Sequence, residues 1–92
     1  MELKNTIDMM NSTDYKERFK AEYYQTKNRY EKLKKLNTKI EAANLTKFNC
    51  LSKVVEMPKH DCPDDMLKEQ QNIMGHYLHI LEVRAEIENI EL

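Results

Sequence analysis

The most regular pattern of apolar residues lies in the first half of the chain. From Phe19 to Ile40, seam residues recur with alternating steps of four and three, the heptad spacing of a helix that packs along one side. This pattern predicts a long helix over residues 14–44. Thr13 or Asp14 can cap it, and Asp14 with Glu17 forms an acidic variant of the capping box. The seam members are Phe19, Tyr23, Thr26, Tyr30, Leu33, Asn37 and Ile40. Polar members of such a seam weaken it but can fix its register.

A second helix is predicted over residues 63–92. Pro63 suits the first turn of a helix, and Asp64 and Asp65 suit the positive end of its dipole. Apolar residues follow at heptad spacing in two rows, one made of Met66, Ile73, Ile80 and Ile87 and the other of Leu67, Met74 and Leu81. Together the rows form an apolar face wider than one partner helix needs, so we expect a homo-oligomer.

The remaining segments are shorter and less regular. In residues 1–13, Leu3, Ile7 and Met10 have helical spacing, but a helix this short must dock on something. Residues 45–62 have no sustained period yet carry five large apolar residues, which favours a packed loop. These five are Phe48, Leu51, Val54, Val55 and Met57. We therefore predict one all-α domain over residues 1–92, a short N-terminal helix plus a long antiparallel helical hairpin, in an oligomeric assembly.

Charge is distributed unevenly along a chain whose net charge is −1. Residues 14–41 carry a net charge of +4 and residues 64–92 a net charge of −5. Two explanations are open: attraction between antiparallel helices, or a basic helix that binds an anionic partner. No apolar run approaches the roughly 20 residues that span a bilayer, and residues 1–10 lack the apolar core of a signal peptide. We expect a cytoplasmic protein without a membrane partner.

The sequence has no catalytic signature, neither a glycine-rich phosphate loop nor a nucleophile elbow. His76 and His79 lie three residues apart without a third ligand, and Cys50, His60 and Cys62 form only a partial, poorly spaced zinc set. Two cysteines do not make a disulfide framework. We therefore expect no enzyme, no cofactor and no metal.

Tyrosine and positive charge concentrate together in residues 14–36, which contain four Tyr, eight Lys or Arg and only four acids. A tyrosine ring can stack on a nucleobase, and cationic side chains can hold phosphate. Phe19 and Tyr23 fit better as packing residues of the seam, whereas Tyr15 precedes the seam. Arg84 stands where the apolar spacing expects a hydrophobic residue, so it requires an anion, either Glu88 one turn later or a ligand.

The stretches "DYKERFKAEYYQTKNRYEKL" and "CPDDMLKEQQNIMGHYLHILEVRAEIENI" resemble a family of small phage proteins related to an open reading frame of a crAss-like phage. The second stretch carries a Leu, Gln, Met, Tyr pattern at helical steps and closes with "LEVRAEIE". The family includes the type-2 anti-CBASS cyclic-nucleotide sponges. The resemblance covers about residues 14–44 and 62–92.

This resemblance implies a helical hexamer in the host bacterial cytoplasm that binds cyclic dinucleotides or trinucleotides between protomers, without catalysis. The base-stacking tyrosine of the family corresponds to Tyr15, and its phosphate-binding basic residue falls at Arg29 or at Tyr30. The basic residue of the trinucleotide pocket corresponds to Arg84. With the basic neighbours, the expected ligand-binding residues are Tyr15, Lys16, Arg18, Arg29, Tyr30, Lys32 and Arg84.

Two other functions remain open from the residues alone. The chain could be a small helical oligomeric interaction protein that inhibits a host protein through its helical surface. It could also bind nucleic acid, but a net charge of −1 and an acidic last helix disfavour DNA or RNA, where phosphate contacts dominate affinity.

Overall fold

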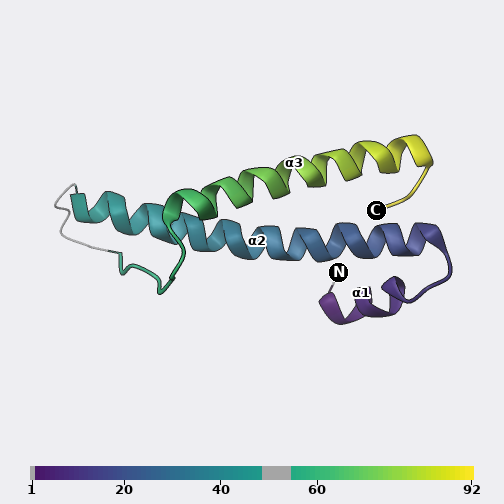
Figure 1. Ribbon diagram of the computed structural model, residues 1–92, viewed down its shortest axis with the longest axis horizontal. Helices are drawn as coiled ribbons and strands as arrows, with labels where there is room; N and C mark the ends of the chain where they lie inside the picture. Colours follow the sequence, from purple (N-terminus) through teal and green to yellow (C-terminus); the bar gives the residue numbers. More distant parts are fainter. Residues whose placement is uncertain (1, 49–54) are drawn as a thin grey trace.

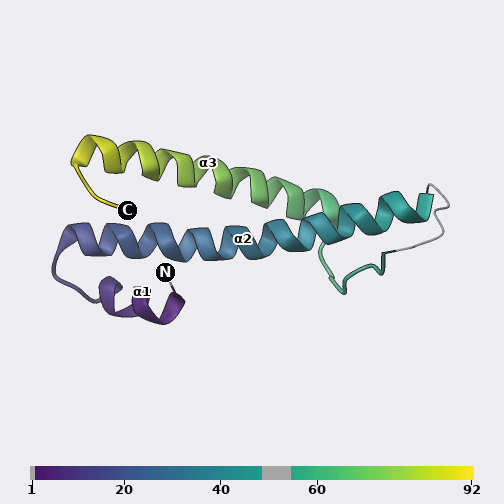
Figure 2. The same cartoon turned by 180° about the vertical axis from the view of Figure 1, so that it is seen from behind.

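The computed structural model describes residues 2–48 and 55–92, and these residues form three helices and no strand. Helix α1 spans Leu3–Met10, α2 spans Tyr15–Phe48 and α3 spans Asp64–Glu88. Figures 1 and 2 show α2 as the long central element, with α3 along one side and α1 against its N-terminal half. The predicted all-α class is confirmed.

Helices α2 and α3 run in opposite directions along one another. Tyr15 at the start of α2 bonds Glu88 at the end of α3, and Asn44 near the end of α2 bonds Asp64 at the start of α3. The seam predicted for α2 is buried at all but one position, Tyr30, which is half-buried. The buried members are Phe19, Tyr23, Thr26, Leu33, Asn37 and Ile40.

The polar seam residue Asn37 fixes how α2 lies against α3. Its side-chain amide donates to the backbone carbonyl of Leu67 at 3.1 Å and to Oε1 of Gln71 at 2.8 Å. Asn37 is almost fully buried, so a shift of either helix would leave its amide without partners, at a cost of about 1–3 kcal/mol. The amide therefore specifies one register.

Only part of the apolar surface of α3 faces α2. Its buried residues are Leu67, Leu78, Leu81 and Ala85, which belong to or adjoin the second predicted row. The first row, which we call the outer row, stays between 41% and 77% exposed and consists of Met66, Ile73, Ile80 and Ile87. A single chain thus leaves a heptad row of large apolar side chains in water.

The end of α3 returns the chain to the core. Asn89 adopts the left-handed conformation with φ 58°, and the Ile90 N–H donates to the carbonyl of Ala85 at 2.8 Å. This is a Schellman cap, in which Asn tolerates the positive φ and the following residue packs back. Ile90 is accordingly buried with Phe19 and Tyr23. The helix ends four residues before the predicted residue 92.

Helix α1 docks in a way that its apolar spacing did not predict. Thr6 is fully buried, and its hydroxyl accepts a 3.0 Å hydrogen bond from Gln25 of α2. The apolar stripe of Leu3, Ile7 and Met10 is instead exposed. Asp14 caps α2 as predicted, because its carboxylate accepts the Lys16 N–H at 3.0 Å.

Of the five apolar residues that predicted a packed loop over residues 45–62, the structure describes the exposure of Val55 and Met57. Helix α2 continues to Phe48, four residues beyond the predicted end. Val55 and Met57 are exposed rather than packed, while Cys50, Leu51 and Val54 lie outside the described residues. No helix in the described part of the chain is both long and apolar enough to cross a membrane.

Candidate ligand-binding site

Two of the predicted ligand-binding residues meet where α2 begins and α3 ends. The Tyr15 hydroxyl donates to Oε1 of Glu88 at 2.9 Å and accepts from Nη2 of Arg84 at 2.7 Å. Arg84 also donates from Nε to Oε2 of Glu88 at 3.0 Å. These three side chains form a closed ring of hydrogen bonds, which we call the Tyr15–Arg84–Glu88 cluster. It joins α2 to α3 at the surface.

Two neighbours complete the surroundings of this cluster. The Arg84 guanidinium lies 5.2 Å from the centre of the Phe19 ring, within the range of a cation–π contact. Lys16 directs its ammonium to the backbone carbonyl of Asn89 at 3.4 Å, close to the same helix end. Phe19 therefore serves both the core and Arg84, a role that its place in the seam did not indicate.

Hydrogen bonds within the cluster shift the pKa values of its three side chains so that Glu88 and Arg84 stay charged and Tyr15 stays neutral. The pKa of Glu88 is lowered, first by the hydrogen bond from Tyr15 and then by Arg84. The pKa of Tyr15 is raised because its hydroxyl donates to Glu88. The pKa of Arg84 is raised mainly by its bond to Glu88. At neutral pH the cluster thus holds a carboxylate, a guanidinium and a neutral phenol.

The other predicted residues do not join this cluster within one chain. Arg18 turns back and donates to the Ser12 carbonyl at 2.9 Å. Arg29 and Lys32 are exposed on α2, and Arg29 lies fourteen residues, about 21 Å of helix, beyond Tyr15. A small ligand cannot touch Tyr15 and Arg29 of the same chain at once.

Tyr30 has a packing role at the α2–α3 interface. It packs against the cluster of buried residues that contains Phe19 and Tyr23. A Cβ added to Gly75 would lie 3.3 Å from Cε2 of Tyr30, so the glycine gives this ring its space. A groove of about 240 Å³ opens beside the ring, lined by Tyr23, Lys27, Tyr30, Glu31, Gly75, Leu78 and Glu82.

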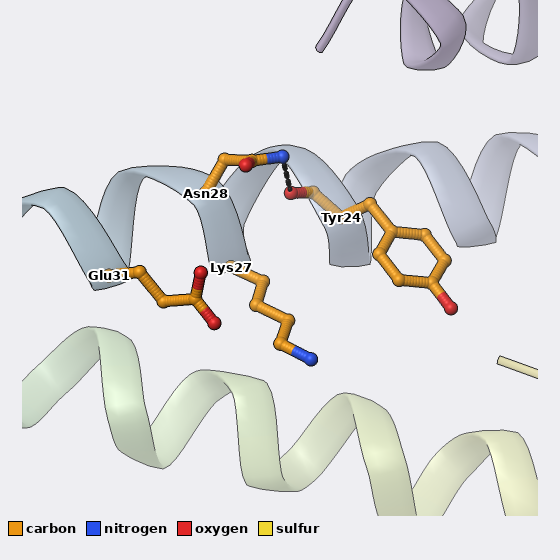
Figure 3. Close-up of a pocket in the computed structure, with 4 residues that line it drawn as sticks. All are labelled: Tyr24, Lys27, Asn28 and Glu31. Carbon is orange, nitrogen blue, oxygen red and sulfur yellow. Dashed lines mark hydrogen bonds between the residues drawn. The ribbon is translucent and has the colours of Figure 1, made fainter. Parts of the chain in front are cut away.

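A second, more polar groove lies on α2 itself. Figure 3 shows its four lining residues, Tyr24, Lys27, Asn28 and Glu31, all carried by one side of this helix. The Asn28 amide donates to the Tyr24 carbonyl at 2.9 Å, while the Lys27 and Glu31 side chains extend toward α3. Lys27 and Glu31 line both grooves, which makes them the polar groups common to the two.

Tyrosine–glutamate pairs, and not ion pairs, connect the basic and acidic helices. Three phenols donate across the interface to a glutamate of the other helix: Tyr15 to Glu88, Tyr23 to Glu82 and Tyr77 to Glu22. In the described parts of the chain, no Lys or Arg of α2 forms a salt bridge with an acid of α3. Direct pairing therefore does not account for the charge asymmetry. Lys16 and Arg18 instead donate to backbone carbonyls, and the Lys27 ammonium lies 5.9 Å from the centre of the Tyr23 ring.

A protein-family model described as Sequestin matches residues 35–87, more than half of the chain. The chain belongs to the Sequestin family. This membership confirms the family-level resemblance drawn from the sequence. Nothing among curated proteins or solved structures matched the chain. Of the expected ligand-binding residues, Arg84 lies inside the Sequestin match, whereas Tyr15, Arg29, Tyr30 and Lys32 precede it.

Metal-ligating side chains do not gather in the part of this Sequestin chain that the structure describes, where no group of three or more could hold an ion. His60 instead bonds Asp64, with Nε2 lying 2.7 Å from Oδ1, and Cys62 packs near Leu33 and Leu67. His76 and His79 are exposed on α3. The partial zinc set that includes Cys50 extends outside the described residues.

Proposed function

We propose that this protein sequesters cyclic oligonucleotide immune signals, as an anti-CBASS sponge of the phage that carries it, and catalyses no reaction. Membership in the Sequestin family supports a sequestering role. The observation that carries the nucleotide assignment is the meeting of Tyr15 and Arg84 at one exposed helix end. An aromatic ring next to a guanidinium suits a ligand made of bases and phosphates.

Two features of Tyr15 support the proposed stacking on a base. Its ring is 46% exposed at the first turn of α2, while its hydroxyl is fixed by Arg84 and Glu88. A ring held at its hydroxyl keeps one orientation, which lowers the entropy lost on stacking. Arg84 presents a planar guanidinium that can pair with two phosphate oxygens.

A complete pocket requires more than one copy of the chain. Tyr15 and Arg29 are about 21 Å apart along α2, so both touch one ligand only if they come from different copies. The outer row of α3 provides a surface for such assembly, because exposed apolar rows at heptad spacing are typical of helical interfaces. We propose a homo-oligomer, a hexamer by the family resemblance, with the ligand between protomers.

The direct test is calorimetric titration of the purified protein with a panel of cyclic dinucleotides, cyclic trinucleotides and cyclic ADP-ribose isomers. Binding of at least one cyclic oligonucleotide, with recovery of the intact ligand after denaturation, is the expected result. Linear dinucleotides of the same bases serve as controls for unspecific phosphate binding. Absence of heat with the whole panel, or release of a cleaved product, contradicts the proposal.

A second function is supported by the exposed stripe of α1. Leu3 and Ile7 are exposed, and Met10 is half-exposed with its sulfur accepting from the Gln25 amide, which also bonds Thr6 and so holds α1 on α2. Such a stripe fits a small helical interaction protein that inhibits a host protein through its surface. Under this alternative the nucleotide panel gives no heat, and Ile7→Lys abolishes inhibition of host defence while Tyr15→Ala leaves it intact.

A further inference from the structure

Both carboxylate oxygens of Glu88 are used within the Tyr15–Arg84–Glu88 cluster. Oε1 accepts from the Tyr15 hydroxyl at 2.9 Å, and Oε2 accepts from Nε of Arg84 at 3.0 Å. Tyr15 and Arg84 are further joined by their own 2.7 Å hydrogen bond. The Tyr15 hydroxyl and the Arg84 guanidinium therefore form one site with two donors. The two oxygens of the Glu88 carboxylate already occupy this site.

This arrangement has the chemistry of phosphate recognition. A phosphate also presents two oxygens to a converging pair of donors, and guanidinium binds carboxylate and phosphate with the same planar geometry. Glu88 comes from α3 itself, one turn after Arg84, so it is present at the site whenever the chain is folded. A ligand phosphate that takes the donors of Tyr15 and of Arg84 Nε has to displace Glu88.

Helix α3 by itself does not favour a negative charge at Glu88. Glu88 is the last residue of α3, where the helix dipole disfavours a negative charge, and no basic residue stands in the last turn. The Arg84 side chain is about half exposed, and exposed ion pairs contribute little to folding. An acid that is unfavourable for the helix yet bonded at both oxygens points to a role in binding.

We propose that Glu88 is an internal competitor that sets the affinity of the Tyr15–Arg84 site for phosphate. This inference rests on the proposed function, in which that site receives a nucleotide phosphate. A ligand with one phosphate gains a single contact and loses to the tethered carboxylate. The competitor lowers the affinity of every ligand of this site by the same factor, so a mononucleotide with one weak contact is left essentially unbound, whereas a cyclic oligonucleotide held by several phosphates stays bound.

Glu88→Gln tests the competitor, because it keeps the shape of the side chain and removes its charge. Glu86→Gln is the matched control: it makes the same charge change on the same helix, and Glu86 is exposed and outside the cluster. Two probes are used on the parent and both variants. Inorganic diphosphate is titrated with the ¹⁵N NMR signal of Arg84 Nε as readout, and cyclic tri-adenylate is titrated by calorimetry.

We expect Glu88→Gln to bind both probes about fivefold more tightly than the parent, since an exposed pair of this kind reduces the available site by about that factor. Glu86→Gln should bind both as the parent does.

The outcomes separate this inference from the proposed function. Equal diphosphate binding by the parent and Glu88→Gln, or an equal gain in Glu86→Gln, overturns the competitor. A diphosphate gain confined to Glu88→Gln, with no member of the cyclic nucleotide panel bound by any form, supports the competitor and contradicts the sponge function. Cyclic tri-adenylate bound equally well by all three forms supports the function and overturns the competitor.

Discussion

The hydroxyl of Tyr23 in α2 donates a 2.6 Å hydrogen bond to Oε2 of Glu82 in α3. The same kind of bond links Tyr15 to Glu88 and, in the opposite sense, Tyr77 to Glu22. With Leu or Ile at these positions, each of the three glutamates would lose its hydrogen bond to the other helix. Tyrosine serves both needs, since its ring packs in the interface while its hydroxyl reaches the rim.

Tyr23 predicts a loss of stability in alkali. Its pKa is raised to about 12, first by burial and then by the hydrogen bond to Glu82. Because the folded pKa exceeds the unfolded value near 10, the stabilisation is complete below about pH 10 and is lost as pH rises toward 12. Urea unfolding followed by circular dichroism at pH 7, 9 and 11 should show this decline.

Tyr23→Phe is the matched variant for the alkaline decline. It keeps the ring and removes the hydroxyl, so it should cost about 1 kcal/mol at pH 7 and show a shallower loss between pH 9 and 11. If the free energy of unfolding falls equally in the parent and in Tyr23→Phe between pH 9 and 11, other groups cause the loss. Tyr15 and Tyr77 also have raised pKa values.

Alanine at Tyr15 and at Tyr23 should have opposite effects. Tyr15 is half-exposed, so Tyr15→Ala should leave the fold intact and weaken cyclic nucleotide binding about tenfold to a hundredfold through loss of stacking. Tyr23 is only 6% exposed, so Tyr23→Ala should lower the free energy of unfolding by about 3–5 kcal/mol. Calorimetry and urea unfolding measure the two effects; unchanged binding by Tyr15→Ala would count against its role in stacking.

Arg84→Ala should weaken trinucleotide binding and spare dinucleotides, because the proposed dinucleotide contacts are Tyr15 and the Arg29 of another copy, whereas the proposed trinucleotide contact is Arg84. Arg84→Lys is the informative partner variant, because lysine keeps the charge but loses the planar fork that pairs with two oxygens. We expect weak trinucleotide binding in both variants and parent-like dinucleotide binding. Equal losses for both ligand classes would place Arg84 in a shared site.

The outer row of α3 predicts self-association. Light scattering should give a mass well above the 11.0 kDa of one chain at micromolar concentration. The double variant Ile73→Lys with Ile80→Lys should reduce that mass, because it places charge in an apolar contact without touching the face toward α2. Ile7→Lys on α1 is the control, and dissociation by this control alone would move the interface to α1.

His60 predicts a second pH dependence at the start of α3. Its Nδ1 faces the Pro58 carbonyl at 3.0 Å and its Nε2 faces Asp64, so both nitrogens meet groups that only accept. Only the doubly protonated ring satisfies both, and the pKa of His60 is raised by Pro58 first and then Asp64. The contribution is complete below about pH 6.5 and is lost as pH rises through the folded pKa.

The midpoint temperature of thermal unfolding of the parent should therefore fall as pH rises from 5.5 to 8.5. In His60→Gln the midpoint should depend less on pH over the same range. The contribution of Asp64 to stability has the opposite pH dependence, because the pKa of Asp64 is lowered, chiefly by its hydrogen bond with His60. That contribution is present above about pH 4 and is lost as pH falls further. A parent midpoint that does not change between pH 5.5 and 8.5 would mean that the His60–Asp64 bond does not stabilise the fold.

The sequence predicted the long helix of α2 and its buried side because steps of four and three define one face of a helix without reference to a partner. It could not determine which row of α3 would meet α2. Leu67 and Ile73 belong to rows of equal period and similar hydrophobicity. An apolar row has the same spacing whether it packs on a helix of the same chain or on a helix of another copy.

The residues of the candidate site could be predicted from the sequence, but their meeting could not. Tyr15 and Arg84 were singled out separately, one by its place before the seam and the other by its charge within an apolar row, and Glu88 was the expected local partner of Arg84. Their meeting depends on the register of α2 against α3, which the buried amide of Asn37 fixes. Spacing within each helix carries no information on that register. The cation–π contact of Arg84 with Phe19 was missed for the same reason.

The close packing of Gly75 against Tyr30 makes these two positions interdependent. A methyl group at residue 75 would restore about 1 kcal/mol of helix propensity, but it would stand 3.3 Å from the ring, which must then shift by a few tenths of an ångström. A flexible basic side chain at residue 30 would remove that conflict. Among relatives, we therefore expect the two positions to covary: glycine at 75 where 30 is aromatic, and a larger residue at 75 where 30 is lysine or arginine.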